Sequence, residues 1–263
     1  MAYTGGCGKM KISSLSKWSN ISLNWWDILF VKVGIKKGDI NLKMKNGLTL
    51  RLMNRGEHSD TSVVSDIYFN TPYTKADFQI KDNWTIIDIG ANVGIFSTYA
   101  IKQGTGIKVF SYEPTIDNFS YLLSNIKQNK LENNIKAFNF AVTKHAGDKL
   151  KLYINNGGSG GNSLYSEQVE KTSNVETVLT TSLKKIIEEN KLKEIDLLKI
   201  DCEGAEYEIL LNSSINDLLK VKRIVIELHP INGYSKEILE KFLNKIGFRT
   251  YLNSSGMLCA VKK

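Results

Sequence analysis

The sequence predicts an α/β protein built on a mainly parallel β sheet. From residue 85 onwards, short apolar segments of strand length alternate with segments whose apolar residues recur at helical spacing. The first apolar segment runs directly into a glycine-containing turn, and the last two are joined by a short polar turn. This alternation is typical of a parallel sheet with helices on both faces, and the final pair indicates an antiparallel hairpin that closes the sheet.

The first part of the alternation contains three strands and two helices. The predicted strands are Thr85–Ile89, Ile107–Tyr112 and Ile135–Phe140. A helix over Val93–Gln103 ends before Gly104. The next helix begins after Thr115, a suitable N-cap residue, and its expected apolar face is Ile116, Phe119, Leu123 and Ile126.

The last part contributes two more strands, two helices and the hairpin. The predicted strands are Ile195–Ile200, Arg223–Leu228, Phe248–Leu252 and Met257–Val261. A helix near Ala205–Leu211 joins the first two strands. The last helix is capped by Ser235 and closed by Gly247.

Residues 143–191 interrupt the alternation as an insertion. We expect a hairpin at Lys149–Ile154, a glycine-rich loop from Gly157 to Gly161, a strand at Glu176–Leu179 and a helix capped by Ser182. Long insertions beside a ligand site often form a lid or a substrate wall.

Residues 1–80 predict a small α+β extension. Residues 1–16 are rich in Gly, Ser and Lys and are expected to be loose. One predicted helix carries Trp18, Ile21, Trp25 and Ile28 at helical spacing. It could dock on the domain, lie on a membrane surface or act as a substrate lid. The Asn46-Gly47 turn predicts a hairpin within Asn41–Leu52, and Ser62–Phe69 reads as a short helix.

The chain is basic, with a net charge of +8, so its surface should attract anions such as nucleic acid, an acidic membrane face or an acidic glycan. The basic residues are mostly lysines, and the arginines are Arg51, Arg55, Arg223 and Arg249. Bidentate arginine recognition of phosphate or guanine is therefore not prominent. Nucleic acid stays an alternative substrate, although a solvated basic surface explains the charge more simply.

The cysteines and the N-terminus indicate a cytoplasmic protein. Cys7, Cys202 and Cys259 are far apart and lack metal-ligand spacing, which favours reduced thiols. The N-terminus has no signal-peptide pattern. The apolar stretch from Trp25 to Ile35 is too short to span a bilayer, although peripheral contact with a membrane stays open.

The strongest functional signal is the run Asp88-Ile-Gly-Ala-Asn-Val-Gly94, which follows a strand and opens a helix. Small residues there let backbone N–H groups approach a ligand closely. Glu113 ends the next strand and can accept hydrogen bonds from two ribose hydroxyls. A dinucleotide-binding site also uses an acidic residue to bind ribose hydroxyls. Its GxGxxG fingerprint is absent here, because Asn92 and Ile95 stand in place of the second and third glycines. Asp88 would also be unfavourable beside a phosphate, whereas it suits a cationic ligand.

Two further groups of polar residues follow the fourth and fifth strands. Asp201, Glu203 and Glu206 are carboxylates within six residues of the sequence. Their mutual repulsion can raise the pKa of one of them towards a useful value for a general base. Glu206 could instead face solvent or cap its helix. Glu227 and His229 alternate and so point to one side, and His229 can serve as a base or as a structural histidine.

Taken in order, these motifs resemble the FkbM family of S-adenosylmethionine-dependent methyltransferases. They are DIGANVG at 88–94, YEP at 112–114, AV at 141–142, LKIDCEGAE at 198–206 and ELH at 227–229. The resemblance runs from Ile86 to about Val261, with residues 1–80 matching loosely. It implies a Rossmann-like class I methyltransferase fold, with a mainly parallel seven-stranded sheet over residues 81–263. The extension over 1–80 would then serve substrate selectivity.

The resemblance also implies O-methylation of a sugar, a glycolipid or a polyketide-type natural product. The residues expected around S-adenosylmethionine are Asp88, Gly90, Ala91, Asn92, Gly94, Glu113, Pro114, Ala141 and Asp201, with Ala141 near the adenine. The expected catalytic residues are Asp201, Glu203, Glu227 and His229, of which His229 or Asp201 would take the hydroxyl proton. Mg²⁺ held by Asp201, Glu203 and Glu227 is an alternative way to activate that hydroxyl. A nucleic-acid methyltransferase and a cofactor-binding protein without turnover are the other classes left open.

Overall fold

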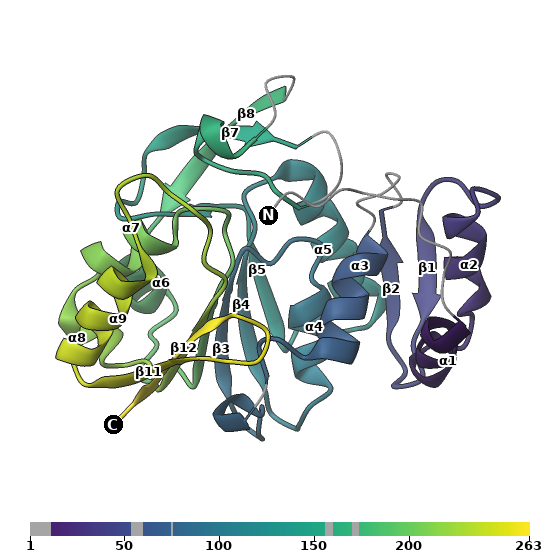
Figure 1. The fold of residues 1–263 in the computed structure, drawn as a ribbon, viewed down its shortest axis with the longest axis horizontal. Helices are drawn as coiled ribbons and strands as arrows, with labels where there is room; N and C mark the ends of the chain where they lie inside the picture. The colour runs from purple at the N-terminus through teal and green to yellow at the C-terminus, as the bar shows by residue number, and fades with distance from the viewer. Residues whose placement is uncertain (1–11, 54–59, 75, 156–159, 170–173) are drawn as a thin grey trace.

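The computed structural model describes residues 12–53, 60–74, 76–155, 160–169 and 174–263. Its centre is a seven-stranded sheet in the order β11-β12-β10-β9-β3-β4-β5 (Figure 1). The strands are β3 (Thr85–Ile89), β4 (Lys108–Tyr112), β5 (Ile135–Phe138), β9 (Leu197–Ile200), β10 (Arg223–Ile226), β11 (Phe248–Leu252) and β12 (Leu258–Lys262). Only β12 runs antiparallel to its neighbours, β10 and β11. The predicted fold class is therefore confirmed, including the closing hairpin.

Helices cover both faces of this sheet (Figure 1). The side chains of its central strands are therefore buried on both sides. The helices are α4 (Ile95–Ile101), α5 (Ile116–Gln128), α6 (Leu183–Glu189), α7 (Glu206–Asn212), α8 (Ile215–Leu218) and α9 (Lys236–Lys245). Alternate strand residues divide between two apolar cores. Ile86 packs with the α4–α5 side and Ile87 with the α6–α9 side. Ser182 caps α6 as expected, since its side chain accepts a hydrogen bond from the backbone of Lys185.

The N-terminal extension shares its core with the α4–α5 side of the sheet. Its elements are α1 (Ile12–Ile21), α2 (Trp26–Lys32), β1 (Ile40–Lys43), β2 (Thr49–Leu52), α3 (Asp60–Ser65), a π-helical turn (Asp66–Asn70) and a 3₁₀ turn (Ala76–Phe78). The hairpin at Asn46-Gly47 is confirmed. The single helix expected through Trp18 and Ile28 is wrong, because the chain breaks at Ser22 to form a β-bridge with Met44. Residues 12–16 are helical, and the remainder of the expected loose segment lies outside the described residues.

Helix α5 fixes the extension to the domain through a polar face. The expected apolar face is wrong at Ile116 and Leu123, which are exposed, whereas Asn118 and Asn125 are buried. The Asn125 amide accepts from Arg51 N at 2.6 Å and donates to Arg51 O at 3.0 Å. Its side-chain nitrogen also lies 2.8 Å from Val93 O, in the turn before α4. Asn125 therefore joins β2 and the turn before α4 to α5.

Two strands of the insertion and the short strand before it form a separate three-stranded sheet in the order β6-β8-β7. Its strands are β6 (Ala141–Val142), β7 (Lys149–Ile154) and β8 (Asn174–Thr181), with a 3₁₀ turn at Ser166–Gln168. The hairpin expected within Lys149–Ile154 is wrong, because that segment is one strand whose antiparallel partner is β8. Most of the loop expected from Gly157 lies outside the described residues.

Cys202 and Cys259 carry free thiols, as expected, and Cys7 lies outside the described residues. Among the described residues, no helix combines the length and the apolar character needed to cross a membrane.

We predict that Asn125→Ala lowers the free energy of unfolding by about 1–3 kcal/mol, because the partly buried backbone of Arg51 and the buried carbonyl of Val93 lose their hydrogen bonds to this amide. Urea unfolding followed by circular dichroism measures the change. Asn212→Ala is the control, because that exposed amide bonds only within its own helix. Equal stability of the two variants would contradict the anchoring role of Asn125.

Candidate active site

A cavity of about 870 Å³ opens at the carboxyl ends of the parallel strands. Nine residues expected from the sequence line it: Gly90, Ala91, Asn92, Glu113, Pro114, Ala141, Asp201, Glu203 and Glu227. Asp88, Gly94 and His229 are outside the lining. The extension adds a wall that contains Asp66, Asn70 and Tyr73, and the β11–β12 turn adds Ser254 and Ser255.

The turn after β3 has a backbone that only glycine can adopt at its first position. Gly90 has φ +76°, and a Cβ placed on it would lie 1.7 Å from the carbonyl oxygen of Asp201. Asn92 is also left-handed, at φ +53°, and its side-chain oxygen accepts from Val93 N at 2.6 Å. Gly94 starts α4 and packs against Leu122. The turn thus lies directly against the end of β9.

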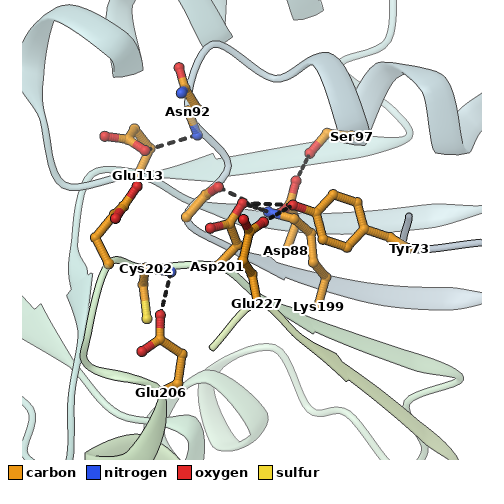
Figure 2. A network of polar contacts seen from close by, with 12 residues as sticks. Tyr73, Asp88, Asn92, Ser97, Glu113, Lys199, Asp201, Cys202, Glu206 and Glu227 are labelled. Atoms are coloured by element: carbon orange, nitrogen blue, oxygen red, sulfur yellow. Dashed lines mark hydrogen bonds and ion pairs between the residues drawn. The ribbon is translucent and has the colours of Figure 1, made fainter. Parts of the chain in front are cut away.

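Glu113 lies at the end of β4, where it supports the same turn. One of its oxygens accepts from Asn92 N at 2.8 Å (Figure 2). The other accepts from Thr115 N at 3.0 Å. Burial raises the pKa of Glu113, and these hydrogen bonds oppose the rise. Asn118 Nδ2 also lies 3.4 Å from the oxygen that Thr115 binds, so further acceptor capacity at the cavity wall lies mainly on the oxygen that Asn92 binds.

Asp88 is fully buried behind the cavity and faces Lys199 (Figure 2). Ser97 donates to one Asp88 oxygen at 2.6 Å, and Lys199 Nζ donates to the other at 3.0 Å. Lys199 Nζ also lies 3.1 Å from Gly90 O and 3.6 Å from Asp201 Oδ2. Burial opposes the charge of Lys199, but Asp88 and Asp201 raise its pKa above the usual value, so it is an ammonium ion. The structure therefore places the charge of Asp88 against lysine rather than in the cavity.

Tyr73 brings the extension into contact with two carboxylates of the domain. Its hydroxyl lies 2.8 Å from Asp201 Oδ2 and 2.8 Å from Glu227 Oε2. Burial and the charge of Asp201 raise the pKa of Glu227. One phenolic hydrogen serves a single acceptor at a time, so the two carboxylates compete for it. Sequence reasoning missed Tyr73, because no motif marks it and it is 128 residues before Asp201.

His229 lies beside the cavity between two carboxylates. Its Nε2 is 3.1 Å from Glu203 Oε2, and its Nδ1 is 2.8 Å from Glu206 Oε1. Burial alone would lower the pKa of His229, but the hydrogen bond to Glu206 and the charge of Glu203 raise it to about 9. At neutral pH both ring nitrogens are then donors. This arrangement does not favour His229 as the base, because it has no free nitrogen with which to accept a proton.

The loop that contains Glu203 is held by the same network. Glu203 has φ +56°, a strained conformation for this residue, and its side chain accepts from Gly161 N at 3.0 Å. Glu206 is fully buried and accepts from Cys202 N and Gly204 N through Oε1. Among the described residues, its Oε2 is a buried side-chain oxygen with no hydrogen-bond partner. Glu206 thus organises the loop after β9 rather than facing solvent.

The residues expected to hold Mg²⁺ do not form an open cradle. Glu203 is bonded to His229 and Gly161, and Tyr73 bridges Asp201 and Glu227. Asp201, Glu227 and His229 do present ligand atoms within 4.8 Å of one another. The histidine of this group, however, already donates to two carboxylates. The observed contacts therefore fit a proton-sharing network better than a hard-cation site.

The strand order, the glycine turn after β3 and the acidic residue ending β4 together define a class I Rossmann-like methyltransferase. The model of the FkbM methyltransferase domain matches residues 88–250. The chain belongs to this family.

Curated relatives agree with this assignment at low identity. The 31-O-demethyl-FK506 methyltransferase FkbM of Streptomyces tacrolimicus is 23% identical over 75% of this chain and 85% of the relative. The hexuronic acid methyltransferase AglP of Haloferax volcanii is 24% identical over 65% of this chain and 66% of the relative. The AMB antimetabolite synthetase AmbE of Pseudomonas aeruginosa is 22% identical over 74% of this chain, which spans only 11% of that protein.

We predict that His229 titrates with a pKa of about 9, which two-dimensional NMR of the imidazole signals can measure. His229→Gln assigns the signal among the three histidines. The pKa of His229 is raised from 6.5 in the folded protein, so protonated His229 stabilises the fold. This contribution to the free energy of unfolding is complete below about pH 6.5 and is lost as the pH rises through 9. The stability of the wild type should therefore fall between pH 7 and 10 more than that of His229→Gln. A pKa near 6.5 would contradict the paired arrangement.

Proposed function

We propose that this chain transfers a methyl group from S-adenosylmethionine to a hydroxyl group of a sugar, a glycolipid or a natural product. The observation that carries the proposal is the pair Asp201 and Glu227, which meets at one phenol beside the glycine turn. The FkbM and AglP relatives, named for methylation of 31-O-demethyl-FK506 and of a hexuronic acid, support the substrate class.

The cofactor half of the cavity would be the wall made by the turn and the end of β4. Glu113 would accept from the ribose hydroxyls, while Gly90, Ala91 and Asn92 approach the ligand with their backbone. Ala141 and Pro114 would border the adenine. Asp88 would act through Lys199 and Gly90 rather than by contact with the cofactor.

The acidic character of the lining fits a cationic cofactor. Among the described residues that line the cavity, Asp66, Glu113, Asp201, Glu203 and Glu227 are acidic and Lys199 is basic. A sulfonium ion is attracted by this excess of negative charge, whereas a phosphate-rich acceptor is repelled. The lining therefore favours a hydroxyl compound without phosphate groups over nucleic acid, even though the whole chain is basic.

The reaction needs a base near the methyl group. The acceptor oxygen attacks the methyl carbon as the carbon–sulfur bond breaks, which releases S-adenosylhomocysteine, and the hydroxyl proton moves to a carboxylate. Glu227 suits this role, because its raised pKa makes it a stronger base than an ordinary carboxylate. Tyr73, whose ring lies over the Lys199 ammonium group, would hold Glu227 in place by donating its hydrogen bond to it.

We predict that Glu113→Ala weakens binding of S-adenosylhomocysteine by at least about tenfold, because hydrogen bonds to a charged group contribute roughly 1.5–3 kcal/mol. Isothermal titration calorimetry measures the affinity. Asp117→Ala, an exposed carboxylate in the first turn of α5, is the control. If a folded Glu113→Ala binds as tightly as the control, Glu113 is not the ribose ligand. Binding of NAD in place of S-adenosylhomocysteine would reject the cofactor.

We predict that Tyr73→Phe lowers kcat by about tenfold or more and leaves cofactor affinity nearly unchanged, since one charge-assisted hydrogen bond is lost beside the base. The Tyr73 hydrogen bond lowers the pKa of Glu227, so its removal should move the acidic limb of the kcat profile to higher pH. The acceptor for this assay comes from a screen of free sugars, glycolipids and polyketides for release of S-adenosylhomocysteine. Cofactor binding with no turnover on any acceptor would favour a binding protein.

A further inference from the structure

Helix α2 and its flanking turns expose a cluster of large apolar side chains on the extension. The cluster, called the apolar patch below, consists of Leu23, Trp26, Phe30, Val33 and Ile35, of which Ile35 is 73% exposed. Trp26, Phe30 and Val33 are spaced so that they share one side of the helix, while Ile28 on the other side is fully buried. The exposure is therefore a property of one face rather than of scattered residues.

The turns extend this face at both ends of α2. Ile35 N donates to Phe30 O at 2.9 Å, which places Ile35 beside Phe30. Leu23 comes one turn before Trp26 and is held to β1, because its backbone nitrogen donates to Lys43 O at 2.8 Å. In Figure 1, α2 forms the outer surface at one end of the molecule, with the β1–β2 hairpin between it and the large sheet.

The segment of the chain that carries the apolar patch is rich in positive charge. Residues 12–53 contain seven lysines and arginines against two aspartates, so this segment holds +5 of the net charge of +8. Both aspartates are already paired, Asp27 with Lys36 at 2.7 Å and Asp39 with Arg51 at 2.8 Å. Lys37 comes two residues after Ile35 in sequence. Lys43 and Lys45 lie on the strand and turn whose backbone bonds to the Ile21–Leu23 segment.

We propose that the apolar patch docks this protein on an anionic lipid bilayer. Tryptophan and phenylalanine on one helix face enter the boundary between headgroups and acyl chains, and surrounding lysines bind anionic headgroups. The combination selects a bilayer over a second copy of the chain, because two copies of a segment with charge +5 would repel each other. This surface is separate from the cavity, and the proposal does not depend on methyl transfer.

The test is flotation of the full chain with vesicles of equal parts phosphatidylglycerol and phosphatidylcholine, compared with vesicles of phosphatidylcholine alone. We expect binding to the anionic vesicles that weakens as salt is raised. Trp26→Gln with Phe30→Gln should reduce that binding by about tenfold or more, since an interfacial helix holds through its buried apolar area.

The matched control is Leu123→Gln with Ile238→Gln. These residues are 46% and 40% exposed, against 47% and 40% for Trp26 and Phe30, and they lie on helices α5 and α9. The control should float like the wild type, and thermal unfolding should show that both double variants are folded. Equal flotation of the two double variants, or no binding to anionic vesicles at low salt, overturns the proposal. Light scattering that shows a dimer lost only in Trp26→Gln with Phe30→Gln would assign the patch to self-association and overturn it as well.

Discussion

Lys199 projects from β9 in the middle of the sheet, and its ammonium group bonds to Asp88 on β3 and to the carbonyl of Gly90. The rest of the cavity depends on this contact. Without the lysine, Asp88 would be a buried and unpaired carboxylate, which is strongly unfavourable. With it, the glycine turn is held against the end of β9, and the charge of Asp201 is partly balanced at 3.6 Å. A positive charge from the sheet thus arranges a cavity whose other ionic groups are acidic among the described lining residues.

The extension completes this arrangement from outside the sheet. Tyr73 reaches the carboxylates of two strands, packs edge-on against Phe96 and lies over the Lys199 ammonium group. The extension also shares an apolar core with the sheet. The sequence predicts that residues 1–80 serve substrate selectivity. Their contacts make the described part of them a structural component of the site as well.

The repeating parts of the fold could be predicted from sequence, because burial on both faces leaves apolar runs and glycine turns at regular intervals. The strand at Thr85–Ile89 was placed without error, and the closing hairpin to within one residue. The polar contacts were less accessible. Asp88 and Glu113 are both acidic residues near the carboxyl ends of adjacent apolar strands, so the sequence does not distinguish them. Of the two, only Glu113 lines the cavity. Long-range pairs such as Tyr73 with Glu227 carry no local pattern, and a buried face of asparagines on α5 looks like a solvent-facing one.

That asparagine face has a consequence for how the small hairpin behaves. A strand edge with open N–H and C=O groups is a template on which other chains can add strands and aggregate. On β2 the outward backbone groups of Thr49 and Arg51 are taken by amides of Asn125, Gln128 and Asn129. On β1 the side chain of Asn24 does the same for Asn41 and Lys43. Side-chain amides thus form the hydrogen bonds that a neighbouring strand would form on each side of the hairpin. The backbone groups of these residues are therefore not available for pairing with a strand of another chain.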